Sequence, residues 1–177
     1  MASRPKAAKK SVSKKAVKKS MANPLVTSLE DHINRVYGMV LQAVKGFSDA
    51  QWVEGSVERM QPARIVYHIF QSTERYTWRG RPEEYVATRK FSQDWEETPA
   101  RDLPGRALAC EHLELVRDWT LEWVRQAGDD LLGKPMWPWV GGTKLAQCLY
   151  HLRNVQHHMG ELNVELQRRS LPIVEWQ

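Results

Sequence analysis

Residues 143–166, TKLAQCLYHLRNVQHHMGELNVEL, carry the clearest helical pattern in the chain. Apolar side chains recur there at spacings of three and four, at Leu145, Cys148, Leu149, Leu152, Val155, Met159, Leu162 and Leu166. Such spacing gathers them on one side of an α-helix. We therefore expect a long amphipathic helix that begins at about Thr143 and buries this face.

Three further helices are predicted upstream. Asn23-Pro24 provides an N-cap and a first-turn proline, and apolar residues then follow at helical spacing up to Gly46. The other two run from Pro62 to near Gly80 and from Leu103-Pro104 to Gly128, with a short helical piece over residues 82–90. No segment shows a strand period of two. The expected fold is an all-α four-helix bundle over residues 23–177, preceded by a tail over residues 1–22.

The positive charge of the chain is confined to this tail. The whole chain has 26 Lys and Arg against 21 Asp and Glu, a formal net charge of +5, and residues 1–20 hold eight of the basic side chains and no acidic one. The remainder carries a formal net charge of −3. We expect the tail, rich in Lys, Ala and Ser, to be disordered. Several roles remain open for it: non-specific contact with nucleic acid or anionic lipid, organelle targeting, a solubilising extension, or a translation-start artefact with the true start at Met21.

Several classes of function are excluded by what the sequence lacks. No run approaches the roughly 18 apolar residues of a membrane span, and no secretory signal is visible, so a cytoplasmic location is expected. Cys110 and Cys148 are then expected to be reduced core residues on helices. Phosphate-binding glycine loops and a GxSxG nucleophile motif are absent, so nucleotide-dependent and serine-hydrolase functions have no support.

The fourth helix also holds the best candidate metal ligands. Asn154 and His158 are four residues apart, one helical turn, which is the spacing at which two side chains of one helix can bind the same ion. His151 and His158 lie about 10 Å apart along the axis, too far to chelate one ion directly. His157 points away from the apolar stripe, and His68 lies at the edge of the apolar face of the second helix. These positions favour a site between the second and fourth helices, although an edge histidine is more often structural.

These residues lie in two strings that resemble the DinB/YfiT-like superfamily. The strings are residues 62–69, PARIVYHI, and above all residues 151–162, HLRNVQHHMGEL, and the resemblance covers about residues 23–170. It implies a four-helix bundle, often dimeric, with a divalent metal such as zinc or nickel held by His68, Asn154 and His158. Members include enzymes that transfer or isomerise through low-molecular-weight thiols. The family pattern usually has His or Glu where this chain has Asn154, and a neutral amide oxygen lowers the expected metal affinity.

Two hypotheses about function follow. In the first, the metal activates a thiol or water for an S-transferase or hydrolase acting on an unidentified small molecule. In the second, the chain is a non-catalytic dimeric bundle with a degenerate site, and residues 1–20 contact nucleic acid non-specifically.

Carboxylates and indoles near the predicted site could assist it. Glu74, Glu161 and Glu165 are candidates to orient an imidazole, although such glutamates more often form a solvated face. The indoles near helix ends could wall a pocket or simply close the bundle; they belong to Trp78, Trp137, Trp139 and Trp176.

Overall fold

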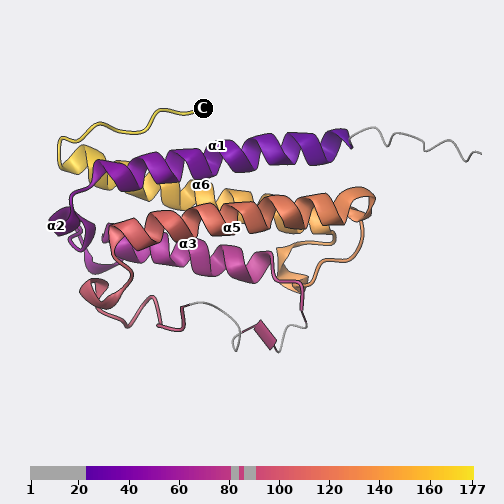
Figure 1. Ribbon diagram of the computed structural model, residues 1–177, viewed down its shortest axis with the longest axis horizontal. Coiled ribbons are helices and arrows are strands. Elements are labelled where there is room, and N and C mark those ends of the chain that lie inside the picture. The colour runs from indigo at the N-terminus through magenta and orange to yellow at the C-terminus, as the bar shows by residue number, and fades with distance from the viewer. Residues whose placement is uncertain (1–22, 81–83, 86–90) are drawn as a thin grey trace, which may run out of the picture.

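Four long helices lie side by side in the computed structural model, which describes residues 23–80, 84–85 and 91–177 (Figure 1). They are α1 (Pro24–Gly46), α3 (Pro62–Tyr76), α5 (Arg106–Ala127) and α6 (Lys144–Arg168). The predicted all-α bundle is confirmed, and no strand occurs among the described residues. The predicted tail and most of the short helix expected over residues 82–90 lie outside the described residues.

The helix ends follow the capping chemistry of the sequence. The Asn23 side chain accepts a hydrogen bond from the Leu25 backbone N–H at 3.0 Å, and the Thr143 hydroxyl accepts one from Ala146 at 3.1 Å. Gly128 ends α5 with a φ of +46°, a left-handed conformation that glycine adopts without steric cost. One predicted boundary is wrong, because α3 ends at Tyr76 rather than near Gly80.

The backbone shows where α3 ends. Thr77 leaves helical geometry with a ψ of 4°, while its N–H and its hydroxyl both bond to the carbonyl oxygen of Thr73. The last turn is therefore closed at Thr77, and the chain diverges before it reaches Gly80.

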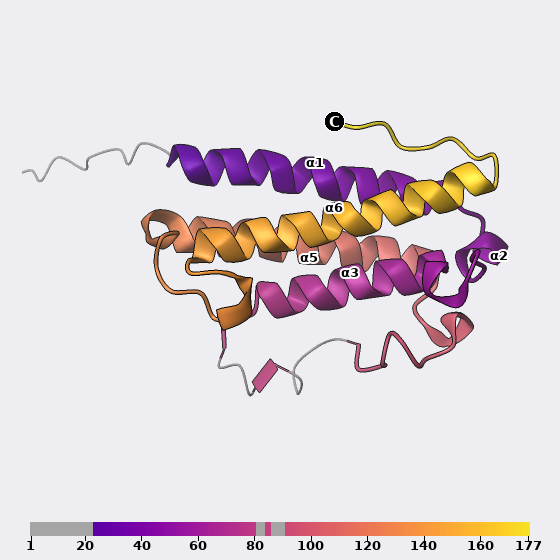
Figure 2. The ribbon, with the colours of Figure 1, turned by 180° about the vertical axis from the view of Figure 1, so that it is seen from behind.

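The helices pack in a square. Viewed from either side, α1 and α6 run in one direction while α3 and α5 run in the other (Figures 1 and 2). α1 packs against α5 and α6, and α3 packs against the same two helices. Helix α3 therefore presents one face to α6 and another to α5, and both faces carry functional groups.

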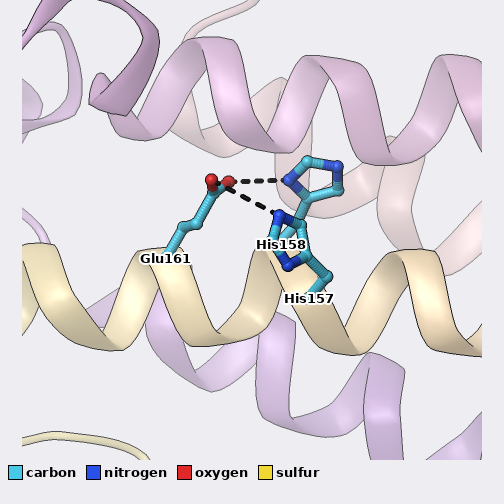
Figure 3. A group of neighbouring side chains, drawn as sticks. All are labelled: His157, His158 and Glu161. Carbon is cyan, nitrogen blue, oxygen red and sulfur yellow. Dashed lines mark hydrogen bonds and ion pairs between the residues drawn. The ribbon is translucent and has the colours of Figure 1, made fainter.

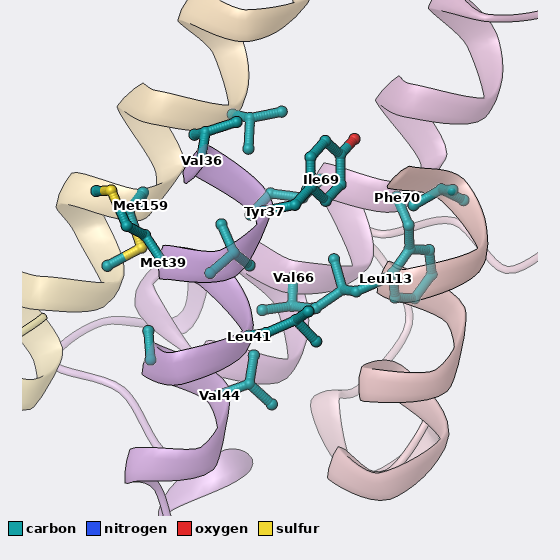
Figure 4. Close-up of a cluster of buried hydrophobic side chains, with 14 of the residues drawn as sticks. Val36, Tyr37, Met39, Leu41, Val44, Val66, Ile69, Phe70, Leu113 and Met159 are labelled. Carbon is teal, nitrogen blue, oxygen red and sulfur yellow. The ribbon is translucent and has the colours of Figure 1, made fainter. Parts of the chain in front are cut away.

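Apolar side chains from all four helices fill the centre of this square. Figure 4 shows Tyr37 of α1 close to Ile69 of α3, and Leu113 of α5 beside Phe70 of α3. Burial of a large apolar side chain contributes roughly 1.5–3 kcal/mol, so this core is the main source of stability. Cys148 is buried in it, and both cysteines are free on helices, as expected.

Short helical turns occupy the connections. They are α2 (Asp49–Trp52), η1 (Glu58–Met60), η3 (Ala100–Asp102), η4 (Gly128–Asp130) and η5 (Pro138–Val140). Within the described part of the chain, no helix is long and apolar enough to cross a membrane.

Candidate metal centre

His68 and His158 meet across the interface between α3 and α6. Their ring centroids lie 4.7 Å apart, with one ring edge facing the other ring. Both residues are half-buried. The sequence predicted that these two histidines share a site, and the packing of α3 on α6 brings them into contact.

Asn154 lies one turn before His158 and is held by a different partner. Its side-chain oxygen accepts a hydrogen bond from the Ser72 hydroxyl at 2.9 Å. Ser72 is one turn after His68, and α3 and α6 run in opposite directions. The Ser72–Asn154 pair is therefore a second contact between the two helices, one turn away from the His68–His158 pair. The amide oxygen is therefore turned toward α3, but it already has a donor.

Glu161 lies about one turn after His158 on α6, whereas Asn154 lies one turn before it, and Glu161 orients the His158 imidazole. Its Oε2 lies 2.7 Å from His158 Nδ1, and its Oε1 lies 3.6 Å from His157 Nε2. Figure 3 shows both imidazoles turned toward this carboxylate. Potential ligand atoms of His157, His158 and Glu161 all lie within 4.8 Å of one another. His157 points away from the core as expected, yet it reaches Glu161, so α6 alone offers a second possible ligand group.

Burial keeps both imidazoles of the α3–α6 pair neutral. Burial and the nearby His158 lower the pKa of His68 to about 4. Burial also lowers the pKa of His158, and the hydrogen bond with Glu161 opposes this effect. A neutral imidazole keeps a lone pair on one ring nitrogen, which is the form that binds a metal ion.

A small cavity opens beside His68. Its volume is about 220 Å³, and its walls include Gln71, Ser72, Arg75, Tyr76, Asp94 and Trp95. The Trp95 ring covers His68 with a centroid separation of 4.3 Å. The cavity thus joins an imidazole to polar side chains and one indole, a composition suited to a small polar molecule.

Arg64 fixes the loop that carries Trp95. This arginine is 1% exposed, and its guanidinium donates to the carbonyl oxygens of Trp95, Glu96 and Thr98, the latter two at 2.7 and 3.0 Å. Sequence reasoning did not single out Arg64 or Trp95. Trp95 follows Arg64 by 31 residues, and its loop carries no periodic signal that would place it over His68.

The other candidate side chains lie away from this centre. Glu165 is buried at the end of α6, where hydrogen bonds from Ser56, Arg169 and Arg168 outweigh the effect of burial and hold its pKa at about 2. His151 is 1% exposed, with Nε2 at 3.1 Å from the Tyr37 hydroxyl, so it is a core residue. Glu74 points to the opposite side of α3 and pairs with His112. Of the three carboxylates considered from the sequence, only Glu161 contacts the predicted ligands.

The indoles considered from the sequence also lie in several different places. Trp137 is buried and donates from Nε1 to the Arg75 carbonyl oxygen at 2.8 Å, while the Arg75 guanidinium lies over the rings of both Trp137 and Trp139. Trp176 is largely exposed. Trp78 lines a second cavity, described below.

The donor set fits a divalent ion in part. Two neutral imidazoles from different helices, one of them oriented by a carboxylate, are typical of ligands for zinc or nickel. The third position offers only a neutral amide oxygen that is already hydrogen-bonded. The residues can therefore hold a metal ion, with lower affinity than a set of three histidines.

Comparison with known proteins agrees with the fold. A search of curated proteins found no match. The sequence model of the DinB superfamily matches residues 32–162, which span α1 to most of α6 and include both histidines of the α3–α6 pair. The chain therefore belongs to the DinB superfamily.

Proposed function

We propose that the chain binds one divalent metal ion between α3 and α6, with His68, His158 and Asn154 as ligands. The observation that carries the proposal is the close approach of two neutral imidazoles, 4.7 Å between ring centroids, from two different helices. The edge-to-face contact is itself modestly favourable, and it also brings imidazole nitrogens from two helices to one place. An ion bound by both would stabilise the arrangement.

Glu161 prepares His158 for this role. Because its Oε2 accepts a hydrogen bond at Nδ1, that nitrogen carries the proton and Nε2 keeps its lone pair. The Arg59 guanidinium lies 3.5 Å from Oε1 of the same carboxylate and restrains it further. The Trp95 ring packs against the His68 ring and reduces its contact with water.

The associated activity is thiol S-transfer or hydrolysis of a small molecule. A bound zinc or nickel ion supplies Lewis acidity, which lowers the pKa of a thiol or water and favours its deprotonation. Gln71, Ser72 and Asp94 offer polar groups that can orient a substrate in the 220 Å³ cavity. The volume limits the ligand of this cavity to a small molecule.

Metal content tests the proposal directly. The chain is purified without a His tag, dialysed against zinc and analysed by inductively coupled plasma mass spectrometry. We expect about one equivalent in the wild type and a loss of most of it in His68→Ala and His158→Ala, since each removes an imidazole ligand. His157→Ala is the matched control, because it removes an adjacent exposed imidazole. Metal content that is equally low in all four proteins would contradict the proposal.

A second candidate function is favoured by the weak third ligand, because the neutral Asn154 amide oxygen already lies within hydrogen-bond distance of the Ser72 hydroxyl. In this alternative the chain is a non-catalytic dimeric bundle, and residues 1–20 contact nucleic acid through their eight basic side chains. Counterion release makes such binding steeply salt-dependent. Binding of duplex DNA by the full chain and by residues 21–177 is compared at several salt concentrations, with sedimentation to measure the oligomeric state. Equal affinity and equal salt slope would exclude the tail as a nucleic-acid contact.

A further inference from the structure

A second cavity lies between α3 and α5, on the side of α3 that faces away from α6. Its volume is about 360 Å³, within the range of small-molecule sites, and its walls include Glu74, Thr77, Trp78, Tyr85, Trp119 and Glu122. It is separate from the His68 cavity, with Tyr85 in the wall of both. Nothing in the proposed metal site uses it.

The innermost polar group of this cavity is a carboxylate with an unmet hydrogen-bonding capacity. Glu74 is 5% exposed, and its Oε1 lies 2.7 Å from Nε2 of the fully buried His112. With Nε2–H donated to Oε1, the other oxygen can only accept. Glu74 Oε2 has no partner among the described residues, and it is the one carboxylate oxygen in that situation there. A buried acceptor without a donor costs free energy, which a ligand with an N–H or O–H group would recover.

Aromatic side chains line the same cavity as this carboxylate. Trp78 and Tyr85 lie edge to face at 6.1 Å between centroids, and Trp119 of α5 lies 6.2 Å from the His112 ring. Trp119 is 40% exposed, so part of its indole is open to a ligand in this cavity. The faces of indole and phenol rings attract cations, most strongly where water is excluded.

Charge at the mouth of the cavity also favours a cation. The exposed Glu122 adds a second carboxylate to that of Glu74, and the exposed Arg79 is the cationic side chain of the described wall. The carboxylates therefore outnumber the guanidinium, and the deeper position is occupied by a carboxylate. An anionic ligand would have to approach Glu74 and Glu122 together.

We propose that this cavity binds an arylalkyl ammonium ion that carries N–H groups. The ammonium group donates a hydrogen bond to Glu74 Oε2, while the aromatic body packs against Trp78 and Trp119. The requirement for N–H groups follows from the unpaired oxygen, because a quaternary ammonium ion offers none. The proposal is independent of the metal site.

Binding of matched small probes to the full-length chain, measured by isothermal titration calorimetry, tests this inference. The probes are 2-phenylethylammonium, its N,N,N-trimethyl derivative, 2-phenylethanol and 3-phenylpropionate. We expect the first to bind at least about tenfold more tightly than each of the other three, because it alone combines positive charge with a donor. Equal or tighter binding of the carboxylate or the alcohol, or the absence of binding by 2-phenylethylammonium at millimolar concentration, would overturn the proposal.

Variants then locate the site. Glu74→Gln keeps the size of the side chain and is expected to weaken 2-phenylethylammonium about tenfold or more, as is Trp119→Ala, which removes an accessible wall. Glu114→Gln on the exposed surface of α5 and His158→Ala in the metal site are controls that should leave binding unchanged. Circular dichroism checks the fold of each variant. Should Glu74→Gln fail to fold, Trp119→Ala decides, and unchanged binding in that variant would reject the site.

Discussion

The two faces of α3 carry similar side chains in opposite settings. On the α6 side, His68 and His158 are half-buried beside a polar cavity, and a carboxylate orients His158 from within the same helix. On the α5 side, His112 is fully buried among Phe70, Phe91 and Trp119, and its partner Glu74 comes from the other helix. The first face leaves an imidazole lone pair available to a ligand. On the second face, His112 commits Nε2 to Glu74 and its Nδ1 is fully buried without a partner among the described residues, whereas the Glu74 side chain lines a cavity.

This difference shows that proximity of titratable groups does not by itself define a metal site. Access and uncommitted lone pairs decide which chemistry each face supports. His112 is fully buried, whereas His68 and His158 are half-buried and His68 lines a cavity, so we propose the metal for the α6 side alone.

The largest expected effect is a difference in unfolding free energy between a variant of the α5-facing side of α3 and a variant of the α6-facing side. His112→Ala removes the partner of a buried carboxylate and leaves a void among aromatic rings, so we expect the free energy of unfolding to fall by about 3–5 kcal/mol. His158→Ala, at a half-buried position, should cost about 1 kcal/mol or less in the metal-free protein. Urea denaturation of both variants measures the contrast. Equal losses would show that the two faces do not differ as described.

Acid sensitivity is expected on the α6 side and in the core beside it. Burial lowers the pKa of His151 to about 3, and burial together with His158 lowers that of His68 to about 4. In the unfolded chain these histidines protonate near pH 6.5, whereas in the folded chain they stay neutral. Between the folded and the unfolded pKa, the unfolded chain therefore binds more protons than the folded one. The free energy of unfolding therefore carries no penalty from these histidines above pH 6.5. It falls as the pH drops toward their folded-state pKa values, by at most about 1.4 kcal/mol per pH unit for each group.

Variant chains isolate this contribution from that of the carboxylates. We expect His151→Gln to have a shallower dependence of unfolding free energy on pH than the wild type between pH 6.5 and about 4. The exposed His32→Gln serves as the matched control and should reproduce the wild-type slope. Identical slopes in all three proteins would mean that His151 is not held neutral by burial.

A smaller effect concerns the third ligand. Asn154→His replaces an amide oxygen with an imidazole, and we expect zinc affinity to rise by about tenfold or more. Asn154→Ala removes the oxygen and should lower the affinity below that of the wild type. Competition with a chromogenic chelator gives both values. Affinities that do not follow the order His, Asn, Ala would exclude residue 154 as a ligand.

Much of the α6 face could be predicted from the sequence, because its signals are periodic. Apolar spacing set the four helices, and the four-residue spacing of Asn154 and His158 placed both on one side of α6. His68 was found as the histidine at the edge of its helix, and packing of α3 on α6 then joined it to His158. Such features depend on local repetition, which a single sequence displays.

The rest depends on contacts between distant segments. Glu74 and His112 are 38 residues apart in the sequence, and no pattern in either helix predicts that they pair. A weak signal was present, since His112 falls at helical spacing with the buried Ala109 and Val116. Arg59 and Trp95 reach the proposed metal site from connecting segments without periodicity, and their positions follow from the tertiary fold alone.

The central claim is that His68 and His158 bind the metal together, and imidazole nitrogen NMR tests it most directly. The ¹⁵N-labelled chain is titrated with zinc, and each histidine is assigned by substitution. We predict that the ring nitrogens of His68 and His158 change shift together and saturate at one equivalent, while those of His157 and His112 do not move. Changes confined to His157 and His158, with His68 unaffected, would place the ion on α6 alone and contradict the account.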